Sequence, residues 1–167
     1  MSRQRSGVAL VEILLGLGLT ALLLQALFPL LATSLLAWNT AVARLTAHQT
    51  ARMAMESMTR ELRLASAVSW PPPGQADSRI QFQVRQASGQ VDRLTFQLGS
   101  STGQNGRTLY RVPASGQPSP LTQDMVDSLV FLFQPPGRIR ISLTVTDSAA
   151  RVATVAETSI TCLNLPD

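Results

Sequence analysis

Residues 13–43 read ILLGLGLTALLLQALFPLLATSLLAWNTAVA and contain twelve leucines but no charged side chain. This run of 31 residues is longer than the roughly 20 that a helix needs to cross a bilayer. It is also longer than the apolar region of a secretory signal, which is about 7–15 residues. Arg3 and Arg5 precede the run, a charge pattern typical of an N-terminal end that stays in the cytoplasm. The stretch therefore predicts one membrane-spanning helix, assigned to residues 8–36, with the remainder of the chain outside.

The composition of the whole chain agrees with this division. Charged residues make up 14% of the 167 residues, compared with about 25% in a typical soluble domain, and the deficit is concentrated in the apolar run. A wholly soluble cytoplasmic domain is therefore excluded as the default. Ala41-Val42-Ala43 resembles a signal-peptidase site, so cleavage of a secretory signal is an alternative, disfavoured by the length of the apolar run.

One acidic residue interrupts the apolar N-terminal region. Glu12 follows Val8-Ala9-Leu10-Val11, and a carboxylate at the centre of a bilayer costs about 2.5–3.5 kcal/mol on insertion scales. One interpretation is that Glu12 lies near the interface and reaches water. The other is that Glu12 has a function and a specific cationic partner.

The residues around Glu12 resemble the processing site of type IV pilins and pseudopilins. A basic leader, residues 1–7, ends in Gly7, and Glu12 is the fifth residue after it. The resemblance implies that prepilin peptidase cuts between Gly7 and Val8 and that the new amine of Val8 is methylated. Pro29 lies seventeen residues after Glu12, where many members of that family have proline. Val8 is a departure, because the family most often has phenylalanine or methionine there.

The same resemblance assigns roles to other residues of the helix. Glu12 is expected to pair with the Val8 amine of an adjoining subunit and so to set the register between apolar helices. Glycine and proline weaken helices, so Gly16, Gly18 and Pro29 are expected to form a helix break when the subunit enters a filament. An alternative for the two glycines is close packing between membrane helices.

The helix is predicted to continue beyond the membrane. Residues 30–70 contain neither glycine nor proline, and the apolar residues Ala51, Met55, Met58, Leu62 and Ala65 recur at helical spacing. We therefore expect an amphipathic continuation over residues 37–70, ended by Trp70-Pro71.

From residue 71 onward the apolar residues alternate with polar ones, which predicts strands. Two strands around Ile80–Val84 and Leu94–Leu98 are expected to form a hairpin. Further strands are expected over residues 108–112, 126–134, 138–147 and 152–163, with a loop over 113–120 and a bulge near Ala156-Glu157. Six strands packed on the helix predict an α+β fold, with a β-rich antiparallel head over residues 71–167.

The head sequence resembles minor pseudopilins of type II secretion, especially the J class, and W-type minor pilins. The segments that carry this likeness are Met58–Ala65, Leu109–Arg111 and Val126–Phe131. The resemblance implies a minor, tip-proximal subunit that is stored in the inner membrane as a single-pass protein and then joins a pilus or pseudopilus. Its expected partners are prepilin peptidase, other minor and major pilins or pseudopilins, the inner-membrane assembly platform and, before assembly, membrane lipid. A type II secretion system, a type IV pilus and a DNA-uptake apparatus are all compatible with this chemistry.

The residues do not form an enzymatic pattern. His48 is the only histidine and lies on the long helix, and Cys162 is the only cysteine, so neither a zinc site nor an activated nucleophile is expected. Asp124 and Asp127 are too few for calcium. We expect a protein that is not an enzyme and has no cofactor or metal.

The alternative function is a membrane-anchored binding module that contacts DNA or a surface and does not join a filament. All fourteen basic residues are arginines, and the net charge is only +4. Arg79, Arg85 and Arg93 of the expected hairpin alternate with polar residues and have no exposed aromatic beside them, although aromatics are what single-stranded nucleic acid stacks on. A solvated face is the favoured interpretation, and no nucleic-acid partner is expected.

Overall fold

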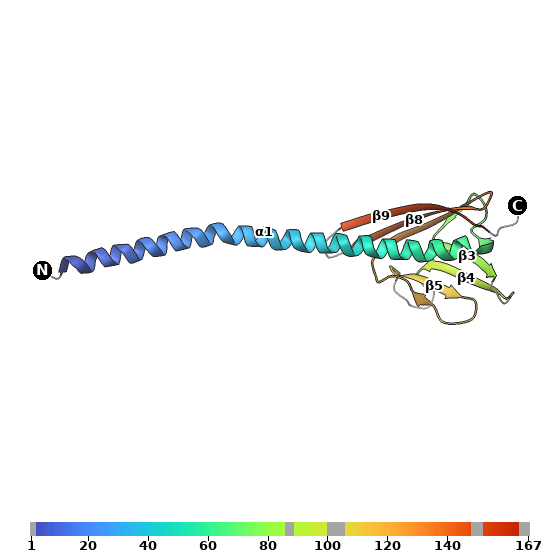
Figure 1. Ribbon diagram of the computed structural model, residues 1–167, viewed down its shortest axis with the longest axis horizontal. Helices are drawn as coiled ribbons and strands as arrows, with labels where there is room; N and C mark the ends of the chain where they lie inside the picture. The colour runs from blue at the N-terminus through green and yellow to red at the C-terminus, as the bar shows by residue number, and fades with distance from the viewer. Residues whose placement is uncertain (1–2, 86–88, 100–105, 148–151, 164–167) are drawn as a thin grey trace. The chain divides into compact units, whose positions relative to one another are not determined.

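The computed structural model describes residues 3–85, 89–99, 106–147 and 152–163, with the backbone alone for residues 3–10. The chain divides into two compact units between Ala41 and Val42. One helix, α1 (Arg3–Arg63), contributes to both units, and the strands all belong to the second (Figure 1).

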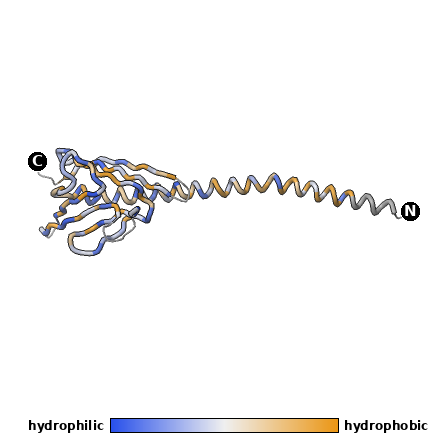
Figure 2. The backbone as a smooth tube through the Cα atoms, turned by 180° about the vertical axis from the view of Figure 1, so that it is seen from behind, coloured by the Kyte–Doolittle hydropathy of each residue, from blue (hydrophilic) through white to orange (hydrophobic). Residues whose placement is uncertain are grey.

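The first unit is a stretch of α1 whose apolar side chains are uncovered. Large hydrophobic side chains from Val11 to Trp38 are 52–77% exposed, and apolar residues recur along this part of the helix (Figure 2). Within the described residues, α1 is the one helix long and apolar enough to cross a membrane. The hydroxyls of Thr20 and Thr33 donate to carbonyls three and four residues earlier, at 2.9–3.0 Å. Their polar groups are therefore satisfied within the helix, as an apolar solvent requires.

The second part of α1 packs against the strands through the predicted face. Ala51, Met55, Met58 and Leu62 are at most 9% exposed. They lie in one cluster with apolar residues of both sheets. This confirms the helical period read from the sequence.

The helix ends earlier than predicted. It stops at Arg63, and residues 65–70, which were expected to be helical, form strand β1 (Ala65–Trp70). The amide of Leu64 donates to the Glu61 carbonyl at 3.1 Å, which closes the last turn. The backbone then pairs with the next long strand, and this tertiary pairing overrides the absence of a helix breaker before Pro71.

Nine antiparallel strands form two sheets in the described part of the chain. The first sheet has the order β1-β3-β4-β5-β6, and the second has the order β2-β7-β8-β9. The bounds of the first sheet's other strands are β3 (Arg79–Arg85), β4 (Val91–Leu98), β5 (Leu109–Pro113) and β6 (Ser119–Pro120). Those of the second sheet are β2 (Ala76–Asp77), β7 (Val126–Gln134), β8 (Arg138–Asp147) and β9 (Val152–Thr161).

The predicted strands and their inward faces are largely confirmed. The hairpin of β3 and β4 pairs Ile80 with Phe96 and Phe82 with Leu94, and all four side chains are buried. The turn Pro135-Pro136-Gly137 joins β7 to β8, and Gly137 has a φ of +69° that favours glycine. The expected α+β class is thus the observed one.

Three expectations about the strands were wrong. Six strands were expected, whereas β1, β2 and β6 are additional, and β6 lies inside the predicted loop 113–120. Strand β9 ends at Thr161 instead of Leu163. It pairs with β8 in unbroken register, so the bulge at Ala156-Glu157 is absent. Thr154, Ala156 and Thr158 still face inward at every second position. The alternation is hard to see in the sequence because the two threonines are polar.

Candidate functional site

The processing and assembly residues lie on α1. The backbones of Gly7 and Val8 are helical, but their side chains lie outside the described residues, as do Met1 and Ser2 of the leader. Glu12 is exposed on the apolar helix. Among the described residues it has neither an ion pair nor a hydrogen bond, so its carboxylate is free to meet a group outside this chain.

The predicted helix break is not present in this isolated chain. α1 continues through Gly16, Gly18 and Pro29 without interruption. A Cβ on either Gly16 or Gly18 would meet nothing within 4 Å, so packing within the chain does not require glycine there. Pro29 has no amide to donate to the Gln25 carbonyl, which weakens the helix locally. Unwinding on assembly stays a prediction.

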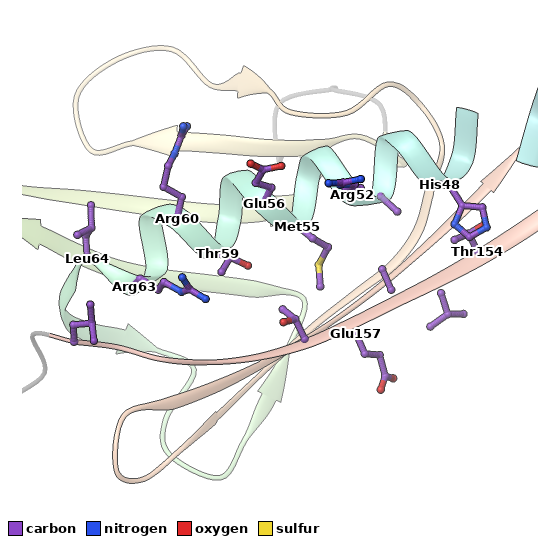
Figure 3. Close-up of a pocket in the computed structure, with 15 residues that line it drawn as sticks. His48, Arg52, Met55, Glu56, Thr59, Arg60, Arg63, Leu64, Thr154 and Glu157 are labelled. Carbon is purple, nitrogen blue, oxygen red and sulfur yellow. The ribbon is translucent and has the colours of Figure 1, made fainter. Parts of the chain in front are cut away.

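A groove of about 780 Å³ lies between the second part of α1 and strand β9. Ala51 and Met55 of α1 are buried along it, as is Thr154 of β9. Figure 3 shows Met55, Thr59 and Arg63 on the side of α1 that faces β9, with His48 beside Thr154. Exposed apolar side chains, Leu64, Val155 and Leu163, complete the lining. The sequence analysis did not identify this groove, because strand β9 and the helix are about a hundred residues apart in the chain.

The groove has an excess of positive charge. Three arginines line it, Arg52, Arg60 and Arg63, compared with two carboxylates. Among the described residues none of the three arginines has an ion-pair partner. Glu157 accepts a hydrogen bond from the hydroxyl of Ser142 on β8 at 3.2 Å, so its carboxylate is held away from α1.

Two ion pairs join elements of the head. The Nε of Arg111 on β5 donates to both carboxylate oxygens of Glu61 on α1, at 2.9 and 3.0 Å. Arg107 contacts Asp127 at 2.8 Å and donates to the Thr146 carbonyl at 3.0 Å. Asp127 is thus engaged by an arginine.

A further cluster was also missed by the sequence analysis. The indole of Trp70 donates to Asp77 Oδ2 at 2.7 Å, and the Arg79 guanidinium lies 5.5 Å from the centre of the indole ring system. Burial raises the pKa of Asp77, but hydrogen bonds from Trp70, Arg79 and Ser78 outweigh it and the net pKa lies below its usual 3.8. Trp70 is only partly exposed, so the expectation that no exposed aromatic lies beside the hairpin arginines is not contradicted, although Arg79 does contact an aromatic ring.

The three hairpin arginines do not all lie together. Arg79 and Arg85 lie at opposite ends of β3, six strand positions or about 20 Å apart. Arg93 on β4 pairs with Gln83 and is therefore a diagonal neighbour of Arg85 alone.

The remaining candidate residues lie apart. His48 is exposed on α1, and Asp124 is exposed just before β7. Cys162 is buried in the core cluster, and burial raises its pKa to about 11. The thiol is therefore protonated at neutral pH. This fits a residue of the core and not a nucleophile. The described residues contain no group of three or more His, Cys, Asp or Glu placed to hold a metal ion.

Comparison with models of known families, with curated proteins and with solved structures finds no match.

Proposed function

We propose that the chain is a minor pilin or pseudopilin that is stored in the inner membrane and assembled, near the tip, into a pseudopilus or type IV pilus. The observation that carries the proposal is Glu12: an exposed carboxylate, without a partner among the described residues, followed on the same helix by 31 uncharged residues, 13–43. In a bundle of such helices this carboxylate needs a cation, and a free N-terminal amine of a neighbouring subunit, made by cleavage after Gly7, provides one.

Three further features support a filament subunit. The apolar side chains of α1 from Val11 to Trp38 are uncovered within the chain and need either lipid or other helices around them. Gly16 and Gly18 have open space at their Cα atoms, which allows close approach of a neighbouring helix. The β-rich unit follows on the same helix, so one element both anchors the head and offers a surface for assembly.

The test of this proposal is the N-terminus of the protein after co-expression with prepilin peptidase. Mass spectrometry of the membrane fraction is expected to show Val8 as the first residue, with an added methyl group. Replacement of Gly7 by a bulky residue is expected to leave residues 1–7 attached. An N-terminus at Arg44 would instead identify an ordinary secretory signal and overturn the proposal.

A second candidate function is a membrane-anchored binding module. The groove between α1 and β9 favours it, because this surface is apolar, cationic and open. Binding in the groove is compatible with filament assembly, so the two functions differ in whether Glu12 is required.

A further inference from the structure

The groove between α1 and β9 has an open strand edge along one side. Strand β9 has a single neighbour, β8, among the strands that the structure describes. One row of its backbone amides and carbonyls therefore faces away from the sheet without a strand partner.

Among the described residues, strand β9 itself carries few of the devices that normally prevent strand pairing. Exposed edges are usually short or interrupted by proline, lysine or a bulge. Strand β9 has ten residues, VATVAETSIT, with one charged side chain, no proline and an unbroken register with β8. The edge is thus suited to receiving another strand.

The position of α1 beside this edge defines how a strand would bind. A helix that lies along an open strand edge, with a groove between them, is the arrangement in which PDZ and PTB domains add a peptide to a sheet. The groove-lining part of β9, Thr154–Thr158, has five residues, about 17 Å of strand, which is close to the usual strand length. Alternate side chains of an added strand would face Ala51 and Met55, which calls for small or β-branched apolar residues.

The charged side chains that line the groove indicate which charge a ligand would carry. Arg63 lies at the β9 side of the last helical turn and has no carboxylate partner among the described residues (Figure 3). Glu56 points away from β9, and Glu157 bonds to Ser142, so neither neutralises Arg63. An incoming carboxylate would gain a charge-assisted hydrogen bond at this end of the groove.

We propose that the groove binds an extended acidic segment of a partner protein, which adds to β9 as a fifth strand of the β2-β7-β8-β9 sheet and pairs a carboxylate with Arg63. The proposal concerns the second unit, Val42–Asp167, alone and stands whether or not the chain joins a filament.

The experiment selects peptides from a random twelve-residue library displayed on phage, using the full chain in detergent micelles. Selected peptides are expected to combine alternating β-branched residues with Asp or Glu. Synthetic copies with alternate backbone amides methylated are expected to lose binding, because such peptides cannot pair with a strand edge.

Two matched variants test the charge. Arg63→Glu is expected to weaken the binding of a selected peptide by about tenfold or more. Arg44→Glu makes the same change on the same helix, but Arg44 is exposed and does not line the groove, and binding is expected to stay within about twofold. Equal circular dichroism of the two variants establishes that both fold.

Several outcomes would overturn the proposal. One is a selection in which no peptide binds the micelles that contain the protein better than it binds empty micelles. Another is peptides that keep their affinity after backbone methylation, since these would bind as helices or by side chains alone. Peptides equally sensitive to Arg44→Glu and Arg63→Glu would show attraction to general positive charge.

Discussion

At the scale of single residues, Glu12 is a charged side chain near one end of an apolar helix that is long enough to span a membrane. Removal of that charge makes insertion easier by up to about 3 kcal/mol if the carboxylate lies deep in the bilayer. It also removes the group that we propose to pair with a neighbouring subunit. Insertion and assembly therefore respond to its mutation in opposite directions.

We predict that Glu12→Ala and Glu12→Gln accumulate in the membrane, are cut after Gly7 and fail to enter filaments. The measurement compares the membrane fraction with the sheared-filament fraction at equal expression, with Gln25→Ala on the same apolar helix as the control. A subunit at the extreme tip would escape the requirement for pairing to a subunit above it. Incorporation of Glu12→Ala equal to that of the unchanged protein would return Glu12 to the role of an interfacial carboxylate.

Cys162 leads to a prediction about pH. Its pKa is raised from 9.0 to about 11 by burial, so the folded chain keeps the thiol protonated while the unfolded chain ionises near pH 9. The contribution of this residue to stability is complete below pH 9 and is lost as the pH rises toward about 11. Urea unfolding at pH 8 and pH 10.5 is expected to show that the free energy of unfolding falls more for the unchanged chain than for Cys162→Ala. Equal falls in the free energy of unfolding for the two chains would show that the thiol ionises equally in the folded and unfolded states.

At the scale of elements, the pattern of polar and apolar residues was enough to predict β3, β5, β7 and β8 within about a residue at each end, and β4 within three residues at its start. What could not be predicted depends on contacts between distant residues. The end of α1 is set by pairing of β1 with β3, and nothing within residues 64–70 disfavours a helix strongly enough to reveal it. Strand β2 joins the second sheet by pairing with β7, which lies about fifty residues later in the chain.

The candidate site shows the same limit. Glu12 and its neighbours were identified from spacing within one helix. The groove, the Glu61–Arg111 pair and the Trp70–Arg79 contact each join residues that only the folded chain brings together. In particular, Glu61 occurs among several arginines of its own helix, whereas its partner lies on β5.

The Glu61–Arg111 pair is predicted to hold α1 to the first sheet. Its side chains are 20% and 33% exposed, and one guanidinium nitrogen contacts both carboxylate oxygens. Glu61→Gln is expected to lower the free energy of unfolding by about 1–2 kcal/mol. Asp127→Asn, in the more exposed Arg107–Asp127 pair, is expected to cost less than about 1 kcal/mol. Equal losses in a urea titration would mean that partial burial adds nothing to the first pair.

At the scale of the whole molecule, the two units follow different physical rules. The described side chains of residues 11–41 form no core of their own, and the exposed apolar ones among them suit an apolar solvent. The second unit has a core in which α1 and both sheets bury side chains together. Phe82 and Phe96 pack with ring centres 5.4 Å apart. We therefore expect the stability of this unit not to depend on the residues up to Ala41.

We predict that a chain beginning at Val42 is soluble and folds alone, because α1 from Ala43 onward buries its apolar face against strands of the same unit. Circular dichroism is expected to show mixed helix and sheet, with one cooperative thermal transition. Met58→Ala removes a fully buried side chain and is expected to cost about 2–5 kcal/mol. Met53 is 63% exposed on the same helix, so Met53→Ala serves as the matched control and is expected to cost less than about 0.5 kcal/mol. If this chain were unfolded alone and gained structure only when mixed with a partner subunit, the head would not be an independent domain, and the core formed by α1 with both sheets would need that partner to be stable.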